Sequence, residues 1–340
     1  MAVPSSRVAL ALLAAWLPAG RAAADQPTVS LSGYLQAQYT AFADGDGDDE
    51  VMNDALALRR VRLRVRARAT EWLGATVMFD PSTTGNLLRD AYASVTAIPY
   101  HEIRVGQQKT QFGYENPESS TRLWTSNRAL VSDALARGSD LRDLGVGLLA
   151  EIPVGGGLAA EYAVTVVNGA GPNTAADDTD SPSLWARLGP RWSAPGDVNV
   201  RAGASLAAGT ARLPDPADPA GSIGADFVRV GVDLEVDAPW LFAAAEVIGG
   251  EDDPVRGRRV RGLGWYALAV GKLPWRSGAL ARFDLLDPDR DTAGDTRRRV
   301  TLGGFHDLQG GRARVRLEAE LDRSAADRDH RLLAWAQVLF

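Results

Sequence analysis

Apolar and polar residues alternate along most of the chain with a period of two, which is the spacing of side chains on the two faces of a β-strand. The final segment shows the pattern clearly, because every second position is apolar: Leu332, Ala334, Ala336, Val338 and Phe340. A last strand that ends on an outward aromatic side chain is typical of membrane-spanning β-barrels.

Sixteen segments carry this alternation, and clusters of Gly, Asp and Pro separate them. Their ranges are 28–42, 56–69, 71–80, 88–98, 102–109, 142–152, 157–168, 182–190, 196–209, 223–236, 239–249, 260–272, 278–287, 298–306, 312–322 and 331–340. Long connections such as 43–54, 213–220 and 250–259 alternate with short turns such as 99–100 and 153–156. The pattern predicts an all-β fold, a transmembrane antiparallel β-barrel of about 16 strands with both ends of the chain on the short-turn side.

A soluble β-sandwich also alternates apolar and polar residues, but its apolar face must fill a core and favours large side chains. Here that face is often Ala, as at Ala91, Ala93, Ala97, Ala243 and Ala245. The short turns also carry aromatic residues that fit an interfacial girdle: Trp72, Tyr100, Trp192, Trp240 and Trp275. Both observations favour the membrane barrel over the sandwich.

Residues 1–24 have the organisation of a secretory signal peptide. Arg7 supplies the positive region, residues 8–17 are apolar, and residues 22–24 are small residues before Asp25. The apolar run is too short for a membrane-spanning helix, which needs about 20 residues. We therefore expect an exported protein whose residues 25–340 form one barrel domain.

Composition narrows the classes of function. The chain has no cysteine, which excludes disulfides and thiolate metal sites, and its formal net charge of −6 argues against a nucleic-acid partner. The three histidines, His101, His306 and His330, lie on separate segments without the spacing of metal ligands. The sequence offers no catalytic constellation, and we expect neither an enzyme nor a cofactor.

The second segment contains a row of arginines. Arg60, Arg62, Arg64, Arg66 and Arg68 alternate with apolar residues, so they share one face of the predicted strand. An arginine facing lipid near the bilayer midplane costs roughly 2–4 kcal/mol, so the row is predicted to face the lumen. A second row, Arg312, Arg314 and Arg316, alternates with Ala313, Val315 and Leu317. In a closed barrel only the first and last strands separate the two rows.

Guanidinium groups suit oxyanions, and a row of similar weak sites allows an anion to move from one to the next. We therefore expect both rows to line a pore for small anionic solutes. The alternative is that these arginines pair with lumen carboxylates and give weak selectivity. Candidate partners are Asp233, Glu235, Glu246, Glu318, Glu320 and Asp322.

Residues 110–141 form the longest connection, and loops of this length in a compact domain are usually functional. We expect this third long loop to fold into the lumen and narrow it. Lys109 stands at its root, and Arg122, Arg128 and Arg137 follow, opposed by Glu115 and Glu118. Residues 129–136 are expected to form a short helix capped by Ser126 or Asn127. A lid over the mouth of the barrel is the alternative.

Several motifs resemble the phosphate-selective porin O/P family. They are residues 104–115 (RVGQQKTQFGYE), 58–62 (LRRVR), 90–93 (DAYA), 142–146 (RDLGV), 167–171 (VNGAG), 264–266 (GWY) and the terminal Phe340. The resemblance implies a sixteen-stranded, usually trimeric porin whose third loop folds inward and whose basic residues conduct phosphate. It places Lys109 at the basic loop root, while Gln111 replaces a common proline. From their position in the long connection, we expect Lys109, Arg122 and Arg128 to act at the constriction.

The expectation is thus a passive diffusion channel in the outer membrane of a Gram-negative bacterium, preferring small anions such as phosphate. Its expected partners are those solutes, outer-membrane lipid, two further copies in a homotrimer, and the barrel-assembly machinery through the strand ending at Phe340. A weakly selective general porin is the first alternative. A structural or enzymatic barrel is the second, although a hydrolase would need a Ser/His pair that the sequence does not offer.

Overall fold

The computed structural model describes residues 26–44, 54–83, 85, 87–136, 142–174, 181–215, 218–323 and 329–340. The expected signal peptide, most of the first long connection and Arg137 lie outside these residues. Among the described residues, no helix is long and apolar enough to cross a bilayer.

The strands are β1 (Thr28–Asp44), β2 (Ala55–Arg68), β3 (Leu73–Phe79), β4 (Leu88–Val95), β5 (His101–Lys109), β6 (Arg142–Gly155), β7 (Leu158–Val167), β8 (Ser183–Ala194), β9 (Val198–Asp215), β10 (Asp218–Asp237), β11 (Leu241–Pro254), β12 (Val260–Lys272), β13 (Ser277–Asp287), β14 (Arg297–Leu308), β15 (Ala313–Arg323) and β16 (Asp329–Leu339). One helix, α1 (Leu130–Leu135), and a 3₁₀ turn, η2 (Gln309–Gly311), complete the described elements.

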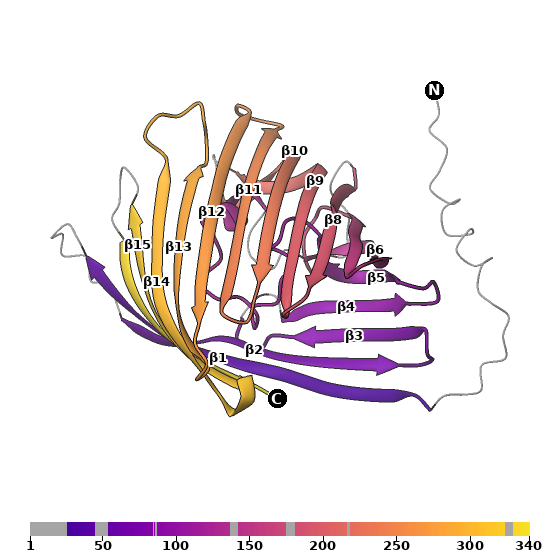
Figure 1. Ribbon diagram of the computed structural model, residues 1–340. Coiled ribbons are helices and arrows are strands. Elements are labelled where there is room, and N and C mark those ends of the chain that lie inside the picture. Colours follow the sequence, from indigo (N-terminus) through magenta and orange to yellow (C-terminus); the bar gives the residue numbers. More distant parts are fainter. Residues whose placement is uncertain are drawn as a thin grey trace, which may run out of the picture.

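Each strand pairs with its sequence neighbours, and β1 pairs with β16, so the sheet closes into a barrel (Figure 1). All described pairings are antiparallel. At the seam the Gly33 N–H donates to the Phe340 carbonyl at 2.8 Å, and the Phe340 N–H donates to the Gly33 carbonyl at 3.0 Å. The predicted closed barrel of sixteen strands is confirmed, as is the placement of β1 and β16 between β2 and β15.

The two faces of the strands differ as the period of two predicts. On β10, Val228, Val230 and Val232 are exposed, with exposed fractions of 49–57%, while Arg229 and Asp233 on the alternate positions are buried. We call the face with the valines the apolar face and the face with Arg229 and Asp233 the polar face. A closed sheet with exposed valines and buried charges places its apolar face outward, where a bilayer supplies the apolar surroundings.

The buried apolar cluster lies between the segment 110–136 and the polar faces of β7 to β14. Phe112 meets Trp185 of β8 edge-on with ring centroids 5.8 Å apart. Trp124 packs between Phe242 and Phe305, at centroid distances of 5.6 and 5.0 Å. This core therefore joins a connection to strands far from it in sequence, which fixes the segment against the barrel wall.

Some local expectations were wrong. The expected connection 213–220 is largely strand. The pairing of β9 with β10 continues past the pair of Leu213 and Ile223, as far as the pair of Asp215 and Asp218. Likewise β11 extends to Pro254, so the connection expected at 250–259 is shorter. Helix α1 forms, but its N-cap is Ala129 with no side-chain cap, rather than Ser126 or Asn127. Carboxylates from elsewhere satisfy its first N–H groups instead.

The aromatic residues at the short turns are mostly exposed. The exposed fractions of Tyr100, Trp192, Trp240 and Trp275 are 62%, 46%, 67% and 64%. Large rings left in contact with the surroundings at one end of the barrel fit an interfacial girdle, since tryptophan and tyrosine place an apolar ring and a polar atom in the same region.

Candidate channel-lining site

The arginine row of β2 divides into two groups. Arg62 is buried, and its Nε donates to Asp80 Oδ2 at 2.9 Å. Arg60 donates from Nη1 to Gln36 Oε1 at 3.0 Å. Because a buried carboxylate needs compensation, Arg62 and Asp80 act as a structural pair that fixes the start of the β3–β4 connection.

The second group of β2 is Arg64, Arg66 and Arg68. Within the described residues none of the three lies in an ion pair with a carboxylate, and the Arg64 Nη2 only approaches Met78 Sδ at 4.0 Å. Arg66 and Arg68 are exposed and line a hollow of about 440 Å³ together with hydroxyl groups of β1, β3 and β4. Alternate residues on a strand lie about 7 Å apart. Their mutual repulsion falls when an anion enters.

The arginine row of β15 is different. Arg314 makes a bidentate pair with Asp307, at 2.5 and 3.0 Å, and its guanidinium lies 4.6 Å from the centre of the Trp124 ring. Arg316 is buried, lies 3.2 Å from Glu318 and donates to the Leu123 carbonyl at 3.2 Å. Arg312 is exposed at the turn before β15. Arg314 and Arg316 therefore hold the segment 110–136 against the wall.

The basic residues of that segment also have defined roles. Lys109 donates from Nζ to the carbonyls of Asn116 and Glu118, at 3.2 and 2.8 Å. Arg128 is buried and donates to the carbonyls of Glu115 and Glu118. These two cations shape the turn of the segment. Arg122 differs, because its side chain is 73% exposed and meets only the Glu118 carboxylate at 2.6 Å among the described contacts.

Carboxylates of the polar face bind the segment through backbone and side-chain donors. The Ser126 N–H donates to Glu318 at 3.0 Å, and the Asn127 side-chain amide donates to Glu320 at 2.8 Å. At the start of α1, the Leu130 N–H donates to Asp284 Oδ1 at 3.0 Å. Negative charge is favourable at a helix N-terminus, where N–H groups lack helical partners. Glu318 and Glu320 were predicted as partners of arginines. Together with Asp284, they also accept hydrogen bonds from the segment.

Sequence reasoning missed Arg282 of β13. Its guanidinium is fully buried and donates to Thr125 Oγ1 at 2.5 Å, to the Asn127 carbonyl at 2.8 Å and to Asp284 at 2.8 Å. Arg282 and Asp284 on the same face of a mainly apolar segment were the available signal. The position of Arg282 on the polar face opposite the long connection is what marks it as an anchor.

Gly113 explains how the segment passes close to the wall. Its φ is +66°, and a Cβ at this position would lie 1.8 Å from Glu246 Oε1. The neighbouring Tyr114 N–H donates to the same oxygen at 3.2 Å. Only glycine combines this backbone conformation with so close an approach.

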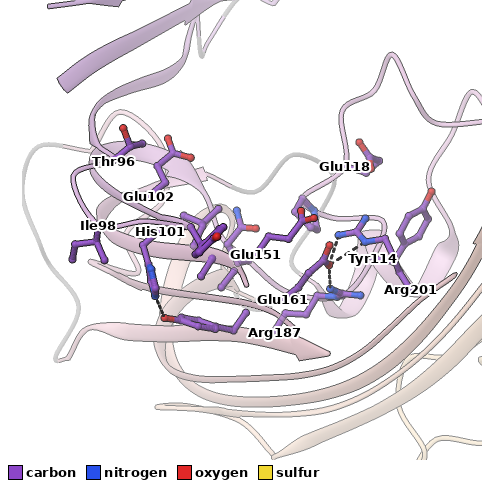
Figure 2. Close-up of a pocket in the computed structure, with 18 of the residues that line it drawn as sticks. Thr96, Ile98, His101, Glu102, Tyr114, Glu118, Glu151, Glu161, Arg187 and Arg201 are labelled. Carbon is purple, nitrogen blue, oxygen red and sulfur yellow. Dashed lines mark hydrogen bonds and ion pairs between the residues drawn. The ribbon is translucent and has the colours of Figure 1, made fainter. Parts of the chain in front are cut away.

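A second hollow of about 530 Å³ lies among the polar faces of β5 to β9 and residues 111–122 of the segment. Figure 2 shows Glu161 between Arg187 and Arg201. Nearby, His101 Nε2 and the Tyr162 hydroxyl lie 2.7 Å apart. Arg201 contacts Glu161 at 2.8 Å, and Arg187 pairs with Asp233 at 2.5 Å. Positive and negative side chains are thus balanced along this wall.

Two more of the carboxylates expected as arginine partners lie close to arginines. Asp322 pairs with Arg299 at 2.5 Å, and Glu235 lies 3.7 Å from Arg201. Arginine–carboxylate pairing therefore covers much of the polar face, but in the part of the chain that the structure describes the three arginines at the end of β2 are outside it. Among the described residues no cluster of His, Asp and Glu has the geometry of a metal site.

One carboxyl group of the segment has a shifted titration. Loss of hydration and the nearby charge of Glu115 raise the pKa of Asp133 to about 6, which the surrounding arginines only partly offset. Asp133 lies on α1 and changes charge close to neutral pH, so the electrostatic field of the segment depends on pH in that range.

Solved structures of several known proteins resemble this barrel. The chain resembles the anion-selective porin from Comamonas acidovorans, with a TM-score of 0.69 at 13% identity over 93% of this chain and 100% of that one. It also resembles the outer membrane channel DcaP of Acinetobacter baumannii, with a TM-score of 0.63 at 15% identity over 92% and 97%. OmpT of Vibrio cholerae in a trimer form gives a TM-score of 0.64 at 14% identity over 93% and 100%. At these identities the likeness establishes the barrel fold.

A search of curated protein sequences finds no match to this chain. The family described as phosphate-selective porin O and P matches residues 29–279, which include β2 with its arginine row and the whole segment 110–136. The resemblance noted in the sequence motifs is therefore confirmed, and the chain belongs to the phosphate-selective porin O and P family, as an outer-membrane porin.

Proposed function

We propose that this porin is a passive channel that prefers small anions, phosphate among them, and that Arg64, Arg66 and Arg68 form its conducting wall. The observation that carries the proposal is that these three guanidiniums share the polar face of β2 and have no carboxylate partner among the described residues. Their positive potential is therefore available to a solute, whereas that of Arg62, Arg187, Arg299, Arg314 and Arg316 is largely cancelled.

We further propose that the segment 110–136 lies in the lumen and narrows it from the side of β8 to β15 and the seam. Beyond the seam, the Tyr34 and Ser120 hydroxyls lie 2.6 Å apart, and Arg59 Nη2 donates to Asn127 Oδ1 at 2.6 Å. The segment's hydrogen bonds to polar-face side chains such as Asp284 and Glu318, and the packing of Trp124 between Phe242 and Phe305, support this placement. Solutes then pass beside the segment, along the end of β2 that carries Arg64, Arg66 and Arg68 and along the hollow lined by β5 to β9. Arg122 is the cation of the segment that remains exposed to them.

The remaining parts of the proposal concern assembly. Residues 1–24 are removed on export, the short turns with their aromatic girdle face the periplasm, and the long connections face outward. A homotrimer fits the trimer form of OmpT from Vibrio cholerae, which shares the fold. In a trimer each barrel keeps its own pore, so the channel argument applies to every copy.

Planar-bilayer recording tests the proposal. In a potassium chloride gradient the purified porin should give a reversal potential of anion sign. The triple variant R64Q/R66Q/R68Q should lose most of that preference, by about tenfold in the permeability ratio, because focused potentials of several kT change local ion concentrations by at least that factor.

The matched control is R258Q/R259Q/R261Q, which also removes three arginines. These three pair with Asp289, Asp253 and Asp291 at the rim, so the reversal potential should change little. An equal change in both triples would show that only net charge matters and would support a weakly selective porin. Cation preference in the unmodified protein would contradict the proposal.

A further inference from the structure

The apolar face of β14 and β15 carries two arginines that the channel does not use. Arg298 and Arg323 are direct partners across the antiparallel ladder, and both are exposed. They share a face with Leu302 and Leu321, whose exposed fractions are 49% and 42%. They therefore point outward, at the barrel end where β14 begins and β15 ends, which is the end with the long connections.

This pair lacks the compensation that its neighbours have. Within the described residues neither Arg298 nor Arg323 has an ion-pair or hydrogen-bond partner, whereas Arg259 and Arg261 on the same rim contact Asp253 and Asp291 at 2.7 and 2.9 Å. Like charges directly opposite each other on neighbouring strands destabilise a sheet. An anionic group between the two guanidiniums would remove that cost and make charge-assisted hydrogen bonds.

An apolar trough continues from this pair along the same strands. It has a volume of about 680 Å³ and is lined mainly by outward side chains of β14, β15 and β16, among them Leu302, Val315, Ala319 and Leu332. Leu302 pairs with Ala319, four residues along from the two arginines, which is roughly 13 Å at the rise of a strand. The trough therefore begins at about the depth where acyl chains begin beneath a phosphate-bearing headgroup.

Small residues create the trough. A Cβ at Gly304 would meet only the Gly278 carbonyl oxygen, at 3.5 Å, so the space outside this residue is open. A continuous strand of large side chains would have filled it. The wall thus offers a cationic pair for a headgroup and, in line with it, room for an apolar chain.

We propose that Arg298, Arg323 and this trough bind a phosphorylated, acylated lipid of the outer leaflet, of the kind represented by lipid A. The two guanidiniums hold one phosphate between them, since their planar forks match its oxygens, and one acyl chain lies in the trough. The site goes beyond the channel function. It rests only on the outward orientation of the long connections proposed above, and the ion preference of the lumen plays no part in it.

Native mass spectrometry of the purified porin in detergent, titrated with bisphosphorylated lipid A, tests the site. The variant R298Q/R323Q should bind the lipid at least about tenfold more weakly, because it loses charge-assisted hydrogen bonds to one phosphate. The control is R297Q, which removes an exposed arginine next to Arg298 in sequence but on the other face of β14. Equal weakening by R297Q would overturn the proposal.

A second pair of variants tests the trough separately. G304L should fill it and weaken lipid binding, whereas G271L adds the same side chain to the outer face of β12, where nothing lies within 4 Å, and should leave binding unchanged. Lipid A without its phosphates should bind weakly to the unmodified protein. Failure of the unmodified protein to retain lipid A, or equal loss in both glycine variants, would contradict the site.

Two further outcomes identify other occupants. Full displacement of the lipid by millimolar inorganic phosphate would assign the arginines to a free anion. A dimer or trimer peak that disappears in R298Q/R323Q without any change in lipid binding would assign the surface to another copy of the chain. Either result overturns the lipid proposal. The reversal potential of R298Q/R323Q should equal that of the unmodified protein, so the channel proposal and the lipid proposal succeed or fail separately.

Discussion

β2 and β15 carry the same alternation of arginine with apolar residues, yet the structure uses the two rows differently. On β15, Arg314 pairs with Asp307, and Arg316 is buried beside Glu318 and beneath the segment 110–136. On β2, Arg62 is tied into a buried pair with Asp80, and the row from Arg64 onward has no carboxylate partner among the described residues. Alternation sets which face a charge occupies, but the residues on adjacent strands decide whether that charge is available.

The strongest test of this comparison is R316A. Removing one partner of a buried ion pair typically costs about 3–5 kcal/mol, because the remaining charge is left uncompensated. Arg316 also holds the Leu123 carbonyl, so the segment should loosen. We expect unfolding in detergent at a lower concentration of guanidinium chloride. The channel current should fluctuate more, and the sign of the reversal potential should not change. Loss of anion preference without loss of stability would mean that the β15 row conducts.

The seam that joins the two rows gives the next test. A Cβ at Gly33 would lie 2.6 Å from both the Arg62 carbonyl oxygen and Phe340 Cε2, so G33A should cost about 1–3 kcal/mol. The measurement is the fraction of folded protein as the denaturant concentration rises. G271A is the control, since nothing lies within 4 Å of a Cβ there. Equal stability of the two variants would show that the ring of Phe340 moves aside freely.

A single exposed cation should have a smaller effect. Arg122 is mostly exposed and its pair with Glu118 is of a kind worth about 0–1 kcal/mol, so R122Q should leave stability nearly unchanged. If the segment lies in the lumen as proposed, the variant should still reduce anion preference modestly in bilayer recordings. A change in anion preference as large as that of the β2 triple variant would show that the segment, and not the β2 wall, sets the preference.

The smallest expected effect is the pH response of Asp133. Its pKa of about 6 means that the carboxylate is charged at pH 7 and mostly neutral at pH 5. One charge at roughly 10 Å in water contributes about 0.4 kcal/mol, or about a twofold change in local anion concentration. Anion preference should therefore rise slightly as the pH falls from 7 to 5, and D133N should abolish that rise. A persisting rise in D133N would assign it to another group.

The period of two was sufficient to predict the fold. It predicted the number of strands, the closed order and the outward position of Phe340, because each depends only on which face a side chain occupies. Strand ends were harder: residues 213–220 were expected as a connection, but the β9–β10 ladder continues into this stretch as far as the pair of Asp215 and Asp218. Turn residues indicate where a chain is able to leave a sheet, and cross-strand pairing decides where it does.

The site was predictable only in part. The facing of both arginine rows followed from spacing, but the partner of Arg314 required the register that sets it opposite Asp307. The anchoring role of Arg282 depends on a hydrogen bond to Thr125, 157 positions away in the chain. No local pattern contains such a contact, because it is made by the three-dimensional path of the segment.

Closure at the β1–β16 seam also bears on folding time. The Gln36 side-chain amide donates to Gln337 at 2.7 Å, joining residues 301 positions apart. Contacts this distant in sequence form late and slowly, since most of the chain must be ordered before they are made. Until then β1 and β16 present unpaired strand edges, which invite pairing with other chains. The period between export and closure is thus the stage at which this protein is most exposed to aggregation.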